Sequence, residues 1–125
     1  MTSTAPGTNL FANAEDAVTF AAGSAIFAQG EVGNAMYVVQ EGEVDIVVNG
    51  VTVETVGPNG LFGELALIDQ EPRSSSAIAR TECRLVAVDQ TRFMMMLRQT
   101  PFFAIQVLKI MAHRLRATDS RLGGG

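Results

Sequence analysis

Glu64 and Arg73, nine residues apart, have the chemistry to hold a small anionic ligand. Glu64 begins a segment, residues 64–67, that is expected to form the first turn of a short helix, and the free N–H groups of such a turn favour an anion. Arg73 carries a guanidinium that matches phosphate oxygens bidentately. Ser74 and Ser75 follow it and add hydroxyl and backbone donors. The segment therefore predicts a phosphate site.

The carboxylate of Glu64 needs a role of its own, because it would repel a bound phosphate. We expect it to accept a hydrogen bond from a neutral hydroxyl, such as a ribose 2′-OH. Gly63 lets the backbone approach a ligand closely. The backbone amides of Leu65 and Ala66 are expected to donate to the phosphate. Anion donors, one acceptor and short spacing together indicate a ribose phosphate.

The segment resembles the phosphate-binding cassette of cyclic nucleotide-binding domains, the family of the catabolite activator protein and the protein kinase A regulatory subunits. The resemblance rests on FGELAL at residues 62–67 and PRSSSA at residues 72–77. Glycine-punctuated segments at residues 30–39 and 41–44 are similar to the family's strand-corner motifs, so the resemblance covers about residues 18–120. The alternative is a plain helix and loop between two strands, with Arg73 solvated.

Composition limits the classes of function. The 125 residues predict one domain over 1–125, and an apolar fraction of 47% suits a packed core. A net charge of −4 argues against general affinity for nucleic acid. Cys83 is the only cysteine and reads as a buried apolar residue. The N-terminus lacks the features of a signal peptide and no apolar run is long enough to span a membrane, so the default compartment is the cytoplasm.

Enzymatic readings lack their residues. A metal-dependent cupin needs two or three histidines, and a serine–histidine–aspartate set needs a nearby base, but His113 is the only histidine. The expectation is therefore no enzyme, no metal and no cofactor. No direct DNA binding is expected either, since the chain ends at Gly125 before a helix-turn-helix could fit. Two alternatives stay open: a ligand-silent interaction module, and a regulatory fragment of a larger transcription factor or channel.

The site must be positioned by short strands. After a loose tail over residues 1–9 and a short helix over residues 10–16, apolar runs broken by glycine fill residues 18–89, with the cassette at residues 60–79. Asn49 and Gly50 predict a type I′ hairpin. Gly23, Gly30, Gly33 and Gly42 are interpreted as turn residues without a ligand role. The pattern predicts an α+β fold, an antiparallel jelly-roll barrel with a short N-terminal helix and C-terminal helices.

Residues 90–122 predict two helices, one ending near Gln99 and the next beginning at Pro101. The second helix carries two apolar stripes about 100° apart. We assign the first stripe to the barrel and the second, which keeps heptad spacing, to the same helix of a second subunit. The first stripe comprises Phe103, Val107, Ile110 and Arg114, and the second comprises Ala104, Leu108, Met111, Leu115, Thr118 and Leu122. The alternative is one wide apolar face against the chain's own core.

The resemblance also implies roles on this helix. Thr118 matches a threonine that contacts the adenine edge, although Asp119 replaces a serine beside it. Arg114 is expected to pair with Glu64 on a different ground, because a charge on the barrel-facing stripe needs a partner. The purine is expected to lie between this helix and a barrel wall. Ile46, Val53 and Val56 are the candidates for that wall. The ligand implied is cAMP rather than cGMP, although Ser74 leaves the base open. Its binding is expected to shift the last helix between two packings. The expected partner is a second copy of the chain, bound through this helix, or an effector protein.

Overall fold

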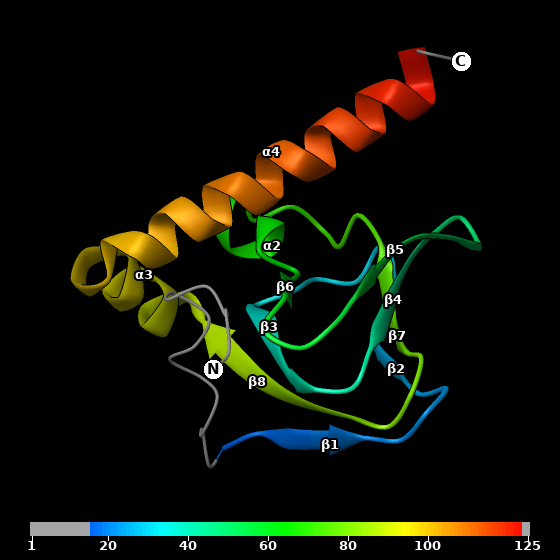
Figure 1. Cartoon of the computed structure of the whole chain (residues 1–125), viewed down its shortest axis with the longest axis horizontal. Helices are drawn as coiled ribbons and strands as arrows, with labels where there is room; N and C mark the ends of the chain where they lie inside the picture. Colours follow the sequence, from blue (N-terminus) through cyan, green and yellow to red (C-terminus); the bar gives the residue numbers. More distant parts are fainter. Residues whose placement is uncertain (1–15, 124–125) are drawn as a thin grey trace, which may run out of the picture.

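The computed structural model describes residues 16–123, with side chains described as far as Arg116. Eight strands form two four-stranded antiparallel sheets, ordered β1-β8-β3-β6 and β2-β7-β4-β5 (Figure 1). The strands are β1 Val18–Phe20, β2 Ala25–Phe27, β3 Ala35–Glu41, β4 Val44–Val48, β5 Val51–Val56, β6 Leu61–Phe62, β7 Ser76–Ala79 and β8 Cys83–Asp89, and the helices are α2 Leu65–Ile68, α3 Gln90–Gln99 and α4 Pro101–Gly123.

The predicted α+β jelly roll with C-terminal helices is confirmed, except that the strands form two separate sheets rather than one closed barrel. The tail expected over residues 1–9 lies outside the described residues. So does the helix expected over residues 10–16, apart from its last residue. Within the described part of the chain, no helix is long and apolar enough to cross a membrane.

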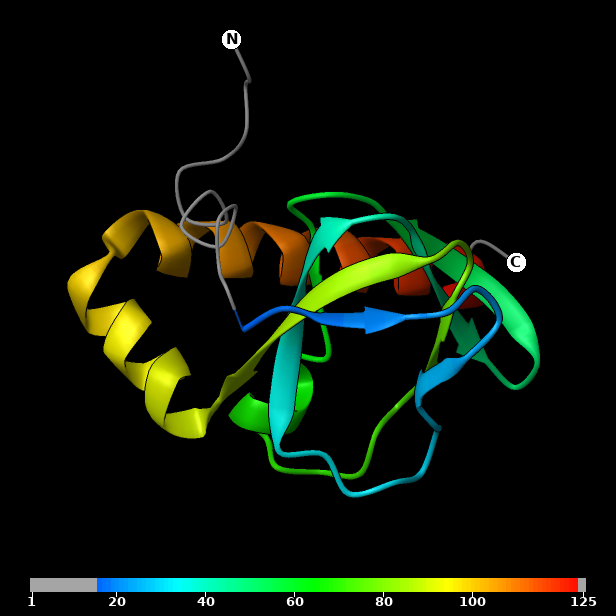
Figure 2. The same ribbon diagram turned by 90° about the horizontal axis from the view of Figure 1, so that it is seen from below.

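The first sheet is covered on both faces, which explains the unbroken apolar run in β3. On one face, Met36 and Val38 join a core cluster with Phe93 of α3 and Phe103 of α4. On the other face, Val39 belongs to a second cluster that it shares with the second sheet. Figures 1 and 2 show α3 at one end of the sandwich and α4 running along it.

The predicted hairpin joins β4 to β5. Asn49 and Gly50 have φ angles of 51° and 82°, as a type I′ turn requires, and Val48 pairs with Val51 across it. This hairpin fixes the register of the strands that form one wall of the site.

Helix α4 packs on the first sheet through its predicted inward stripe, because Phe103 and Val107 are buried and Ile110 packs against the same cluster. The predicted second stripe divides. Met111 also packs against the core, whereas Leu108 and Leu115 are 61% and 63% exposed. The side chains of Thr118 and Leu122 lie outside those described.

Cys83 is buried between the sheets, as its sequence context predicted. Burial, with a smaller contribution from Glu82, raises the pKa of its thiol. The folded protein is therefore expected to react with a thiol reagent at least about tenfold more slowly than the protein in strong denaturant. Equal rates in a colorimetric thiol assay at neutral pH would contradict the burial.

Candidate ligand-binding site

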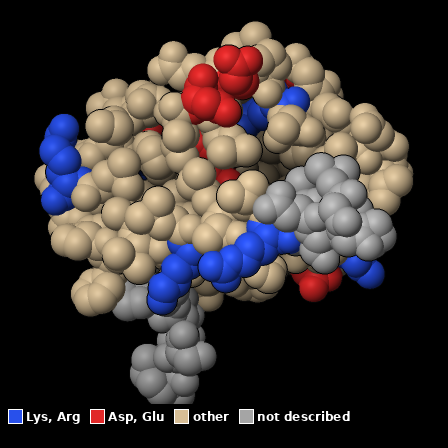
Figure 3. Space-filling model, turned by 90° about the horizontal axis from the view of Figure 1, so that it is seen from above, with Lys and Arg blue, Asp and Glu red and all other residues tan. Residues whose placement is uncertain are grey.

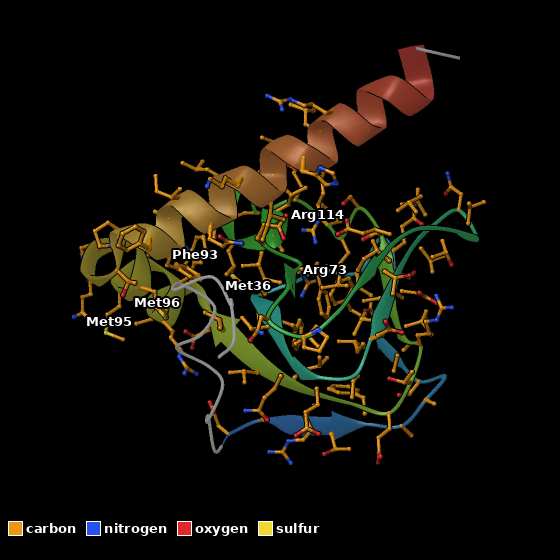
Figure 4. All side chains as sticks on the ribbon, viewed as in Figure 1. Met36, Arg73, Phe93, Met95, Met96 and Arg114 are labelled. Atoms are coloured by element: carbon orange, nitrogen blue, oxygen red, sulfur yellow. The ribbon has the colours of Figure 1, made fainter. Side chains whose placement is uncertain are left out.

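A cavity of about 300 Å³ lies between the β4–β5 hairpin, the cassette and α4. Its walls combine apolar residues with charged groups from four elements or loops. The lining residues predicted from sequence are Ile46, Val53, Gly63, Glu64, Leu65, Ala66, Arg73, Ser74, Ser75 and Arg114. Figure 4 shows Arg73 and Arg114 in the space beneath α4.

Val56 and Thr118 are the two predicted positions that the structure does not place at this cavity. Val56 is 5% exposed and belongs to the core cluster between the sheets, so it does not line the wall to which it was assigned. The pairing of β4 with β5 shifts nearby, because β5 has one extra residue, Val53, opposite Ile46 and Val47. Thr118 lies in α4, but its side chain is outside those described.

Gly63 permits the tight bend between β6 and α2. Its φ of 80° is disfavoured for residues with a side chain, and a Cβ there would lie 2.8 Å from a guanidinium nitrogen of Arg73. Glu64 follows as the residue that caps α2, so the first-turn amides of Leu65 and Ala66 have no acceptor within this short helix.

Arg73 is buried, which the sequence did not predict. It is 7% exposed, and its two terminal nitrogens donate to the backbone oxygens of Ala35 at 2.7 Å and Gly63 at 3.1 Å. Its central carbon lies 3.9 Å from the centre of the Phe27 ring, a cation–π contact. Burial lowers the pKa of Arg73, against the opposing effects of Tyr37, Glu31 and Glu64, but an arginine remains charged in proteins. From the sequence we expected Arg73 to lie near the surface in the absence of ligand; this was wrong, because Phe27, Ala35 and Gly63 enclose it once the sheets form.

Gly33 makes this packing of Arg73 possible. A Cβ at Gly33 would overlap Nε of Arg73, and the glycine does not have a positive φ. The sequence interpretation of Gly33, as a turn residue with no direct ligand role, did not include this packing against Arg73. Nothing in its local sequence signals this close approach, because the two residues are forty positions apart.

The predicted pairing of Arg114 with Glu64 is present, and a second carboxylate joins it. Arg114 NH1 donates to both oxygens of Glu64, at 2.8 and 3.0 Å, while its Nε and NH2 donate to Glu54 at 2.8 and 3.3 Å. NH2 also donates to the backbone oxygen of Leu61 at 2.7 Å. Burial alone would lower the pKa of Arg114, but Glu54 and Glu64 outweigh it and the pKa is raised.

Sequence reasoning missed Glu54 and His113. Glu54 lines the cavity from β5 beside Val53, and strand alternation gave no signal for it, because neighbouring residues of a regular strand face opposite sides. His113 is exposed but lies at the edge of the cavity, one residue before Arg114. Among the described residues, no group of three histidines, cysteines or carboxylates is placed to hold a metal ion.

Residues 17–100 match the family described as "Cyclic nucleotide-binding domain". The CRP-like cAMP-activated global transcriptional regulator of Mycobacterium tuberculosis is 36% identical over 112 residues, which cover 84% of this chain and 49% of that protein. The cAMP-dependent protein kinase regulatory subunit of Aspergillus niger is 39% identical over 84 residues, which cover 66% of this chain and 20% of that protein.

Among solved structures, the catabolite activator protein of Thermus thermophilus superposes with a TM-score of 0.79 at 31% identity. The superposition covers 97% of this chain and 60% of that one. The chain spans about half the length of the bacterial regulator from Mycobacterium tuberculosis.

Proposed function

Because the chain belongs to the cyclic nucleotide-binding domain family, we propose that its cavity binds a cyclic nucleotide, with cAMP preferred over cGMP. One observation carries the proposal: Arg73, the first-turn amides of α2 and the carboxylate of Glu64 all border one cavity of about 300 Å³. These are the donors and the acceptor that a cyclic ribose phosphate requires. The names of the bacterial and fungal relatives, both of which include cAMP, favour the adenine nucleotide.

The cyclic phosphate would bind at the cassette end of the cavity. Arg73 donates to two neutral backbone oxygens, and a phosphate would offer its guanidinium an anionic acceptor that it can bind bidentately. Ser74 and Ser75 line the same wall and add donors, together with the amides of Leu65 and Ala66. Binding would thus exchange or share the carbonyl partners of Arg73.

The ribose would bind at Glu64. This carboxylate is 3% exposed and forms an ion pair with Arg114 at 2.8 Å. A carboxylate has about four lone-pair positions, so it can accept from Arg114 and from a 2′-OH together.

The purine would lie between the hairpin wall, formed by Ile46 and Val53, and α4, where Thr118 is the proposed contact for the 6-amino group. Arg114 connects that helix to the ribose acceptor. A ligand bound to Glu64 would therefore change the contacts of Arg114, which helps to hold α4 on the sheets. We infer that the domain signals through a population shift in the packing of α4, as a regulatory domain without catalysis of its own.

The ribose contact has a direct test in calorimetric titrations with cAMP and 2′-deoxy-cAMP. Wild-type protein is expected to prefer cAMP by roughly tenfold or more, since a hydrogen bond to a charged group contributes about 1.5–3 kcal/mol. Glu64→Gln is expected to reduce that preference, because a neutral amide is a weaker acceptor. Equal affinities of wild-type protein for both ligands would show that Glu64 serves Arg114 alone.

A ligand-silent module is the second candidate, and one observation favours it. Both terminal nitrogens of Arg73, and both oxygens of Glu64, already have partners within the protein. The same titrations, extended to cGMP and cyclic dinucleotides, distinguish the two candidates. Binding of none of these ligands at millimolar concentration would support the silent module.

A further inference from the structure

Glu54 forms the better-aligned of the two ion pairs of Arg114. Its two oxygens accept separately from Nε at 2.8 Å and NH2 at 3.3 Å, which is the side-on fork in which arginine and carboxylate fit best. Glu64 receives from the single nitrogen NH1 instead. The two carboxylates therefore hold different edges of one guanidinium.

These contacts engage all three nitrogens of the Arg114 guanidinium. Nε and NH2 donate to Glu54, NH2 also donates to Leu61, and NH1 donates to Glu64. Because Glu54 occupies the Nε–NH2 edge, the guanidinium cannot turn that edge toward Glu64. Both oxygens of Glu64 then accept from the single nitrogen NH1, and each keeps a further lone-pair position for a ligand.

Glu54 reaches Arg114 from the cavity wall of β5, while Glu64 reaches it from the start of α2. The side chain of Glu54 is 33% exposed, against 4% for Glu64. The more accessible carboxylate thus holds the guanidinium in place, and the more enclosed one faces the ligand. Both carboxylates border the cavity where the nucleotide is proposed to bind.

We propose that Glu54 is a positioning residue for ribose recognition: it fixes the rotation of Arg114 so that Glu64 remains available to a ligand hydroxyl. The inference rests on the proposed function, in which Glu64 accepts from the 2′-OH. Without Glu54, Arg114 would turn its Nε–NH2 edge to Glu64, so that a separate nitrogen would donate to each oxygen in a fork in place of the single nitrogen NH1. The ribose preference would fall, while the phosphate contacts of Arg73 would remain.

The test compares cAMP with 2′-deoxy-cAMP in wild-type protein, Glu54→Ala and Glu54→Gln. Glu54→Ala is expected to reduce the wild-type preference for cAMP about fivefold or more, with the affinity for 2′-deoxy-cAMP changed less than about twofold. Glu54→Gln keeps one acceptor for Nε, so its preference for cAMP is expected to lie between those of wild-type protein and Glu54→Ala. Glu43→Ala is the matched control, because it also removes one negative charge but lies outside the cavity, paired loosely with Arg80 at 3.9 Å.

The outcomes separate the inference from its premise. If wild-type protein binds both ligands equally, the proposed role of Glu64 fails first. The premise holds if wild-type protein and Glu43→Ala prefer cAMP over 2′-deoxy-cAMP and Glu64→Gln does not. If Glu54→Ala or Glu54→Gln then keeps the full preference for cAMP, the positioning role is overturned. Equal losses of affinity for both ligands in the Glu54 variants would also overturn it, since a purely structural role predicts that result. Should Glu54→Ala fail to fold, Glu54→Gln decides the matter by the same ratio.

Discussion

Arg73→Ala is expected to weaken cAMP binding by at least about 2 kcal/mol, roughly thirtyfold, and to destabilise the ligand-free protein as well. The loss of affinity follows from the missing phosphate donors. The loss of stability follows from burial: the backbone oxygens of Ala35 and Gly63 would lose the guanidinium, and each unsatisfied buried acceptor costs about 1–3 kcal/mol. The ring of Phe27 would lose its cation contact too. Calorimetry and urea denaturation measure the two effects separately.

Two variants serve as controls for Arg73. Arg80→Ala removes the same charge from a side chain that is 56% exposed, and it is expected to change neither quantity by more than about 0.5 kcal/mol. Arg73→Lys keeps the charge but loses the planar fork, so it is expected to recover only part of each effect. Near wild-type cAMP affinity in folded Arg73→Ala would contradict the phosphate role, and unchanged stability would contradict the structural one.

The features predicted correctly from the sequence are those with a local cause. Asn49 and Gly50 form the hairpin because both tolerate positive φ. Helix α3 begins after Asp89, whose side chain accepts from the backbone of Arg92, and α4 begins at Pro101, where a missing N–H does no harm. The spacing of Phe103 and Val107 predicted the buried face of α4.

The features that were missed depend on contacts between distant segments. Gly33 and Arg73 meet only after the sheets form, so the glycine looked like a turn residue. Glu54 joins Arg114 across sixty positions, and neither its type nor its spacing marks it. Val56 was assigned to the cavity wall because the face that a strand residue presents depends on the pairing register and on the extra residue Val53 in β5, which the local sequence does not show. Local pattern therefore predicted the elements and the cassette, whereas the surroundings of each charge required the structure.

Leu108→Glu combined with Leu115→Glu is expected to make a dimeric protein monomeric. Both leucines are exposed in the single chain, lie seven residues apart on α4 and share a heptad position. Viewed from above, this face of the molecule is mostly uncharged, and a row of basic side chains crosses it (Figure 3). Leu108 and Leu115 contribute little to the core of the described residues, so the fold is expected to survive, whereas two carboxylates buried in an apolar interface cost several kcal/mol. Sedimentation velocity measures the change.

The control for this interface is Phe102→Glu, because Phe102 is 66% exposed but lies on a different side of α4. It is expected to leave the dimer intact.

Thr118→Ala is also expected to keep the dimer, while it narrows the difference in affinity between cAMP and cyclic inosine monophosphate, which lacks the 6-amino group. An unchanged base preference would remove Thr118 from the proposed site. A wild-type protein that sediments as a monomer with and without cAMP would assign the exposed leucines to an effector protein instead, and base recognition would then have to come from one chain alone.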